Sequence, residues 1–231
     1  MNIALINFSG NVGKTTLAYH LFKPRLENAF LVGIETINDA GSFYDTKVKA
    51  KDFSSIQEEL LINENVILDI GSSNVEQTLI EMKKYQGSHE DLDFFIIPVT
   101  PEVKQQIDSV NTAKFLIDLG IPSKKVKFIF NQVPLDSLAE ELFTPLYTAA
   151  KQLKLDLKIP VIYENEFFDN IEIKSGNLSL TELVNNKDAI KASLREAKPE
   201  DKPYIVKKIG LSRLASTVQD NFNSAFNTLF K

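Results

Sequence analysis

A glycine-containing turn near the start of the chain carries the residue types that bind phosphate. The run reads Ser9-Gly10-Asn11-Val12-Gly13-Lys14-Thr15-Thr16. In a turn that joins a strand to a helix, successive main-chain N–H groups and the helix start attract an anion. Lys14 would place a mobile positive charge on the β- and γ-phosphates, and the Thr15 hydroxyl would bind Mg²⁺. The sequence therefore predicts a phosphate-binding loop.

One position departs from the full phosphate-loop pattern. G-x-x-x-x-G-K-[ST] begins with Gly, and this chain has Phe8 there. Gly13 still lets the backbone approach a phosphate, because it has no Cβ. The alternative is a strand-to-helix turn that carries Gly-Lys-Thr by coincidence. We favour the phosphate loop because it begins the first β–α unit and a second nucleotide signature follows downstream.

That second signature is an acidic strand end, Asp69, after the apolar run Val66–Leu68. A carboxylate beside a phosphate loop can hold Mg²⁺, usually through water. Strand-final aspartates are common, so the prediction depends on the pairing with Lys14. The following residues 71–74 could then sense the γ-phosphate and move on hydrolysis, as switch loops do.

Three further polar residues have candidate roles beside this loop. Glu35 ends the second strand and could orient an attacking water, and Asp39 is the competing candidate. Glu35 could instead be a helix cap or a solvated loop acid. Asn131 offers a donor and an acceptor that suit the adenine edge, or it simply closes its strand. His20 is predicted to be packed or exposed rather than catalytic.

Apolar strand-like runs alternate with helical patterns along the chain. This order predicts an α/β fold in three layers, with a mostly parallel sheet flanked by helices. The expected strands are 3–7, 29–35, 66–70, 94–99, 126–131 and one near 158–162. The expected helices are 14–22, 53–62, 75–85, 101–119 and 138–153. Ligands of such sheets bind at the carboxyl ends of the strands, where the polar residues above lie.

Composition excludes several kinds of site. The 231 residues include no cysteine, so disulfides, thiolate metal sites and cysteine nucleophiles are ruled out. The two histidines cannot build a multi-histidine metal site. The sequence shows no leader-like start and no apolar run as long as a membrane span, so we expect a cytoplasmic protein.

The end of the chain differs from the rest in charge and pattern. Residues 202–231 carry five basic residues and one acidic residue, whereas the whole chain has a net charge of −5. A basic end suggests contact with a polyanion or an acidic partner, or simply a solvated helix. A break at 197–203 predicts a bend before a terminal helix. We therefore expect a domain that carries the phosphate loop over 1–198 and a helical extension over 199–231, packed on that domain or projecting from it.

The predicted terminal helix has one apolar face. Leu214, Val218, Phe222, Phe226 and Phe230 recur every four residues. The first interpretation is packing on the domain core, and the alternatives are a partner-docking helix or a membrane-surface helix. Its polar face is mainly Asn, Gln, Ser and Thr, which argues against strong lipid binding.

Taken together, these motifs resemble the ParA/MinD-type P-loop ATPases. The phosphate loop, the strand ending at Asp69, Ile97–Glu102 and Phe128–Asn131 occur in the order seen in that family. The opening Asn7–Thr16 is most similar to the StbB-type plasmid stability proteins, a branch of that group. The resemblance spans about residues 1–170, and its most specific part is the phosphate loop.

The resemblance implies an ATPase that binds ATP or ADP with Mg²⁺, dimerises around nucleotide and works in plasmid stability, partition or conjugative transfer. By that analogy Lys14 and Thr15 hold phosphate and Mg²⁺, and Asp69 supports the metal. Glu35 or Asp39 serves the water, and Asn131 meets adenine. The resemblance also implies a DNA-binding partner protein, with a direct DNA contact through the basic C-terminal segment as an alternative.

One departure from the family bears on hydrolysis. ParA/MinD loops usually have a lysine that crosses the dimer to the partner's nucleotide, and here Ser9 takes its place, while Asn11 replaces the second Gly. Supplied basic groups raise such rates by roughly 10³–10⁵ in other phosphoryl-transfer systems. Either another basic group substitutes, or hydrolysis is slow and the protein is a nucleotide-controlled switch.

Two other functions fit the sequence. One is an ATP-dependent biosynthetic enzyme similar to dethiobiotin synthetase, whose loop also lacks the crossing lysine. The other is an interaction module that keeps the fold without hydrolysis. The first would need a second polar substrate pocket, for which the sequence carries no distinctive signature.

Overall fold

A computed structural model describes residues 1–35, 43–170, 173 and 178–230. The chain divides into two compact units, and each is described by itself. One unit comprises Met1–Glu164 and Ala225–Lys231, and the other comprises Asn165–Ser224. The boundary expected at residue 198 falls inside the second unit and stays a prediction.

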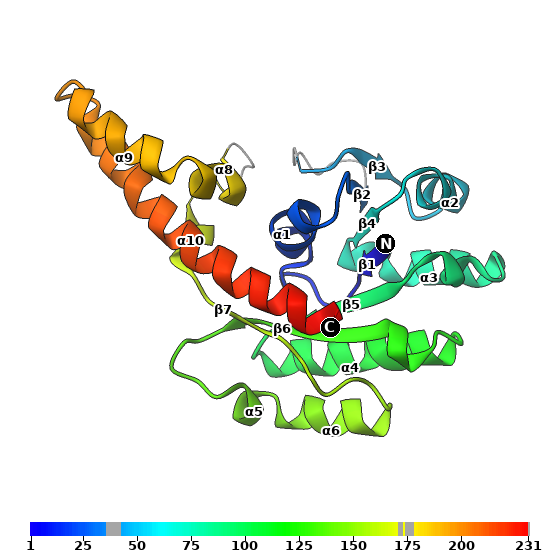
Figure 1. The fold of residues 1–231 in the computed structure, drawn as a ribbon. Helices are drawn as coiled ribbons and strands as arrows, with labels where there is room; N and C mark the ends of the chain where they lie inside the picture. The colour runs from blue at the N-terminus through cyan, green and yellow to red at the C-terminus, as the bar shows by residue number, and fades with distance from the viewer. Residues whose placement is uncertain (36–42, 171–172, 174–177, 231) are drawn as a thin grey trace. The chain divides into compact units, whose positions relative to one another are not determined.

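The first unit is built on a seven-stranded sheet in which every described pairing is parallel (Figure 1). The strand order is β3-β2-β4-β1-β5-β6-β7. The strands are β1 Asn2–Leu5, β2 Phe30–Ile34, β3 Thr46–Val48, β4 Val66–Ile70, β5 Phe94–Val99, β6 Val126–Val133 and β7 Val161–Tyr163. The α/β fold with a parallel sheet is therefore confirmed.

Edge strand β3 is absent from the strands that the sequence predicts. β3 has only three residues and lies at the edge of the sheet, with Lys47 exposed, so it lacks the continuous apolar run of a central strand. β4, by contrast, is buried along its whole length and was predicted with its observed bounds. β1 ends at Leu5, two residues earlier than expected, because Asn7 already belongs to the turn.

The described part of the chain has several helices on one face of the sheet. They are α2 Phe53–Ile62, α3 Val75–Lys84, α4 Val103–Asp118 and α6 Thr144–Gln152. Their buried apolar residues form one core with alternate strand residues, such as Ala4 and Ile6 of the first strand segment. The predicted helix 138–153 is in fact two helices, α5 Ala139–Leu142 and α6. Pro145 lies in the first turn of α6, where its missing N–H costs nothing.

The other face of the sheet is covered by the segment that follows the turn at 9–13. α1 Lys14–Leu17 continues as a π-helical stretch, Ala18–Phe22, with a 3₁₀ turn after it. The end of helix α10 Lys202–Phe230 packs there too: Phe230 lies 6.3 Å from Phe22 and 5.0 Å from Phe94, between ring centroids. The last aromatic ring of α10 therefore contacts the rest of the first unit. The sheet is thus the middle of three layers.

The second unit is helical. α8 Leu180–Asn185 begins with a capping box, in which Ser179 and Glu182 satisfy each other's main-chain N–H groups. α9 Lys187–Glu196 ends before the break predicted at 197–203, and α10 begins within it, at Lys202. The rings of Phe168 and Phe222 stack within this unit. Within the described residues, no helix is both long and apolar enough to cross a membrane.

Candidate functional site

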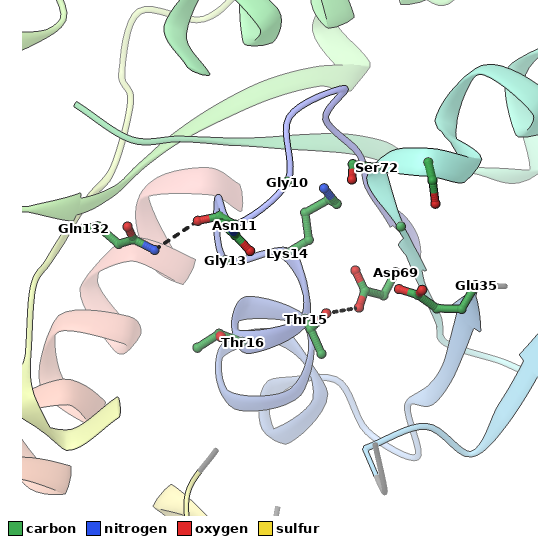
Figure 2. A pocket seen from close by; sticks show the side chains of 12 residues that line it. Gly10, Asn11, Gly13, Lys14, Thr15, Thr16, Glu35, Asp69, Ser72 and Gln132 are labelled. Atoms are coloured by element: carbon green, nitrogen blue, oxygen red, sulfur yellow. Dashed lines mark hydrogen bonds between the residues drawn. The ribbon is translucent and has the colours of Figure 1, made fainter. Parts of the chain in front are cut away.

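A polar cavity of about 500 Å³ lies at the carboxyl ends of β1, β2, β4 and β6 (Figure 2). Parallel strands bring their ends to one edge, so residues far apart in sequence meet there. The cavity is lined by Gly10, Asn11, Gly13, Lys14, Thr15, Thr16, Glu35, Asp69, Gly71, Ser72, Ser73 and Gln132. Most of the residues predicted from the sequence are therefore neighbours. Ser9, Val12 and Asn131 are buried behind the cavity wall.

The turn has a backbone that only certain residues adopt. Gly13 precedes α1 with φ +88°, and Asn11 has φ +58°. A Cβ on Gly13 would collide with the side-chain nitrogen of Asn131. Gly13 is therefore required both for its left-handed backbone and for the close approach of Asn131.

Lys14 is held against the turn that it closes. It is only 7% exposed, and its Nζ donates to the carbonyl oxygens of Asn7 at 3.2 Å and Ser9 at 2.9 Å. Burial lowers the pKa of Lys14 to about 8, although the charges of Asp69 and Glu35 act in the opposite direction. A phosphate beside Lys14 would favour the protonated form, so this residue is suited to bind an anion.

Thr15 and Asp69 meet directly. The Thr15 hydroxyl donates to Asp69 Oδ2 at 2.6 Å, as Figure 2 shows, and the hydroxyl of Tyr44 donates to the same oxygen at 2.8 Å. Asp69 is 1% exposed, and burial raises the pKa of its carboxyl against the two hydrogen bonds and Lys14. Burial likewise raises the pKa of Tyr44, so its phenol keeps its proton.

These donors fit Mg²⁺. Asp69 Oδ1 is buried and has no hydrogen-bond partner among the described residues, so one carboxylate oxygen remains for a cation or for its water. Across the described part of the chain, no group of three His, Cys, Asp or Glu residues could hold a metal. Mg²⁺ is commonly bound by one or two protein oxygens together with phosphates and water, so this small donor set suffices.

Glu35 also lines the cavity, next to Gly71. A Cβ on Gly71 would lie 2.9 Å from Glu35 Oε1, so the absent side chain makes room for this carboxylate. Ser72, next in the chain, lies close to Gly10. The predicted sensor segment 71–74 therefore borders both the loop and Glu35. Asp39 lies outside the described residues.

An irregularity in β6 directs two amide side chains at the turn. Pairing with β7 shifts between Phe130 and Val133, and Gln132 has φ +56°. Such bulges re-aim side chains next to functional sites. Here Asn131 Nδ2 donates to the carbonyl of Val12 at 2.9 Å, and Gln132 Nε2 approaches that of Asn11 at 3.4 Å. Asn131 thus supports the loop backbone, and its proposed contact with adenine stays a prediction.

Helix α4 fixes the start of the turn. The buried amide of Asn7 donates to the Pro98 carbonyl at 2.8 Å and to the Ser109 hydroxyl at 2.7 Å, while its oxygen accepts from Ser9 N at 2.8 Å. The Ser9 hydroxyl donates to Asp108 at 2.5 Å. The side chain at the position of the crossing lysine is thus bonded within its own chain.

Solved structures share this architecture. A variant of McdA from Cyanothece in complex with ATP has 13% identity and a TM-score of 0.51, and the match covers 96% of each chain. MinD of Pyrococcus horikoshii OT3 with Mg-ADP has 14% identity and a TM-score of 0.52, covering 94% of this chain and 95% of MinD. The fold is that of MinD and McdA.

A further match is to the MinC:MinD cell division protein complex of Aquifex aeolicus, with 15% identity and a TM-score of 0.50. It covers 73% of this chain and 83% of the matched one. No protein-family model matches the sequence, and no curated protein matches it. The likeness to MinD and McdA therefore establishes the fold, and the chemistry must be argued from the site.

Three residues of this site are not predicted from the sequence. Tyr44, Gln132 and Asp108 touch Asp69, the loop and Ser9 respectively. None belongs to a spaced motif: Tyr44 reaches the site from the loop before β3, Gln132 through a bulge, and Asp108 from the middle of a helix. The sequence offers one hint for Gln132, which is that it directly follows Asn131 near the end of a strand.

Proposed function

We propose that this protein is a ParA/MinD-like ATPase that binds Mg-ATP and acts as a nucleotide-dependent switch. The observation that carries the proposal is the convergence of Lys14, Thr15 and Asp69 on one cavity, with a buried carboxylate oxygen left for a cation. The structures of McdA with ATP and of MinD with Mg-ADP support the choice of ligand.

The residues in and behind the cavity wall divide the work in this proposal between phosphate, metal and loop. Main-chain N–H groups of Gly10–Thr16 surround the phosphates, and Lys14 leaves the loop carbonyls to neutralise them. Thr15 and Asp69 would hold Mg²⁺, and the bound ion would neutralise negative charge on the phosphates. Asn131 and Gln132 keep the loop in shape, and Asn131 also borders the adenine.

Hydrolysis in this proposal depends on one acidic side chain. Glu35, or alternatively Asp39, orients the attacking water, and a positioning acid needs no strongly shifted pKa for this task. Ser9 carries no charge and is bonded to Asp108, so it brings no cation to a second nucleotide. We therefore expect slow hydrolysis that a partner accelerates, and a bound state that lasts long enough to signal.

The biological role that we propose is plasmid stability, partition or conjugative transfer, through a dimer that forms on nucleotide. The partner would be a DNA-binding protein, with direct DNA contact by the basic end of the chain as an alternative. The MinC:MinD complex is a precedent for a partner protein on this fold.

Calorimetry with Mg-ADP and Mg-ATP tests nucleotide binding. We expect the parent to bind both, and Lys14→Ala to bind at least about tenfold more weakly, because hydrogen bonds to a charged group contribute about 1.5–3 kcal/mol. Lys114→Ala, which removes an exposed lysine of α4, is the matched control. If the parent and Lys14→Ala bind equally poorly, the ATPase proposal is wrong and the fold serves interaction alone.

Sedimentation tests whether bound nucleotide controls the association of the protein with itself. We expect the parent to associate with ATP or a non-hydrolysable analogue and to remain monomeric with ADP, while Lys14→Ala stays monomeric throughout. ATP turnover stimulated by a small metabolite, without nucleotide-linked association, would instead favour a biosynthetic enzyme similar to dethiobiotin synthetase.

A further inference from the structure

The phenol of Tyr44 lies at the predicted metal site, although nothing in the phosphate-loop pattern specifies it. Its oxygen donates to Asp69 Oδ2 at 2.8 Å and lies 3.4 Å from the Thr15 hydroxyl. Oδ2 thus accepts two hydroxyl groups, whereas Oδ1 of the same carboxylate has no partner among the described residues. The two carboxylate oxygens therefore differ, because Oδ2 is hydrogen-bonded within the protein and Oδ1 is left for a ligand.

The sequence provides a specific place for this ring. Gly33 is the last residue but one of β2 and pairs with Asp69 on the neighbouring strand β4. A Cβ on Gly33 would be 2.9 Å from three atoms of the Tyr44 ring, so the ring lies against the bare backbone of β2. A glycine that weakens a buried strand is thereby explained, because it lets the phenol reach the strand-final carboxylate.

Asp45, the residue after Tyr44, holds the backbone of this segment in place. Asp45 N donates to the Leu31 carbonyl at 2.9 Å, and Leu31 N donates to Asp45 Oδ2 at 2.7 Å. Lys23 adds an ion pair with Asp45 at 2.8 Å. The backbone that carries Tyr44 is therefore tied to β2 and to the turn after α1, so the phenol does not depend on Asp69 for its position.

We propose that Tyr44 is a positioning residue of the metal centre. Its hydroxyl, together with that of Thr15, holds Asp69 by Oδ2, which leaves Oδ1 for Mg²⁺ or for a water that Mg²⁺ carries. This inference rests on the proposed function, since it concerns the same nucleotide site. Partners that orient a metal-binding carboxylate typically change metal affinity 10- to 100-fold when they are removed.

The test measures metal binding and nucleotide binding separately, with Mn²⁺ as the probe. Electron paramagnetic resonance gives the affinity of the ADP complex for Mn²⁺, and calorimetry in EDTA gives the affinity for ADP alone. We expect Tyr44→Phe, which keeps the ring on Gly33, to weaken Mn²⁺ binding about tenfold while ADP binding in EDTA changes less than twofold. The control is Tyr85→Phe, which removes a phenol from a ring that packs on Phe53.

A second variant tests the position of the ring. Gly33→Ala places a methyl group where the ring lies, so the phenol must move away from Asp69. We expect it to weaken Mn²⁺ binding as Tyr44→Phe does, and the double variant to lose little more than either single one, because both remove the same hydrogen bond.

The outcomes separate this inference from the proposed function. If the parent binds ADP and Mn²⁺ and Tyr44→Phe binds Mn²⁺ within twofold of the parent, the positioning role of Tyr44 is overturned and the proposed function stands. Equal losses of ADP affinity with and without metal would also overturn it, since the phenol would then act on the loop in general. A parent that binds no ADP overturns the proposed function, and the role of Tyr44 with it.

Discussion

His20 shows what burial does to a single titratable side chain beside the candidate site. It lies in the π-helical stretch after α1, is 4% exposed and meets the ring of Tyr19 edge-on. Burial lowers the pKa of His20 from 6.5 to about 4. The sequence predicts that this histidine is packed or exposed rather than catalytic, and the structure shows it packed and absent from the cavity lining.

The lowered pKa has a consequence for stability in acid. Between pH 6.5 and 4 the unfolded chain protonates His20 and the folded protein does not, so the unfolded state binds more protons and stability falls as the pH falls. The titration of His20 alone therefore lowers the free energy of unfolding by about 2 kcal/mol between pH 7.5 and pH 5. The measurement is the free energy of unfolding in urea at both pH values. From pH 7.5 to pH 5 it should fall by about 2 kcal/mol less in His20→Gln than in the parent.

The other histidine of the chain provides the control. His89→Gln should lose as much stability between pH 7.5 and pH 5 as the parent does, because it leaves His20 in place. An equal pH dependence in the parent and His20→Gln would show that His20 is hydrated or paired with an acid in solution.

At the scale of elements, one strand–turn–helix unit holds the candidate site, and its neighbours fix its shape. β1 leads into the turn, α4 bonds the start of the turn through Ser109 and Asp108, and β6 bonds its middle through Asn131. Each contact crosses about a hundred residues of sequence. The turn is therefore preorganised by tertiary contacts, so a ligand need not supply the free energy of ordering it.

Gly13 allows a direct test of this preorganisation. Gly13→Ala adds left-handed strain of about 1–2 kcal/mol and also drives a methyl group into Asn131. We expect it to abolish measurable Mg-ADP binding in calorimetry and to lower the free energy of unfolding by more than the strain alone.

Two other glycines provide controls that add the backbone strain of a left-handed alanine without a steric clash. Gly87 and Gly120 both have φ +89°, and a Cβ on either meets nothing within 4 Å. Gly87→Ala and Gly120→Ala should therefore cost about 1–2 kcal/mol of stability and leave Mg-ADP binding intact. A Gly13→Ala protein as stable as these controls and still able to bind Mg-ADP would show that Asn131 does not constrain the turn.

The elements that the sequence predicted well are those whose signal is local. The buried strand 66–70 and helix 53–62 have the predicted bounds, since a continuous apolar run and an amphipathic repeat each describe their own structure. The turn at 9–16 was found because a phosphate loop has a fixed spacing. Edge strand β3, the bulge at Gln132 and the contact of Tyr44 with Asp69 were missed, because they depend on pairings between distant segments.

At the scale of the whole molecule, charge is distributed unevenly along a chain of net charge −5. Four of the basic residues of 202–231 lie on α10: Lys202, Lys207, Lys208 and Arg213. Lys202 and Lys207 are exposed, so their charges are available to a polyanion. On the direct-contact version of the proposed function, these residues bind DNA phosphates without reading sequence.

Filter binding of the full chain to duplex DNA, with and without Mg-ATP, tests that version. About four phosphate contacts predict that affinity falls roughly 10²-fold between 50 and 200 mM salt, because each neutralised phosphate releases counterions. Lys202→Glu combined with Lys207→Glu should abolish binding at 50 mM. Lys114→Glu with Lys151→Glu makes the same charge change at exposed positions of α4 and α6 and should weaken binding far less. If the two pairs weaken binding equally, the effect is one of net charge, and contact with DNA must come through the partner protein.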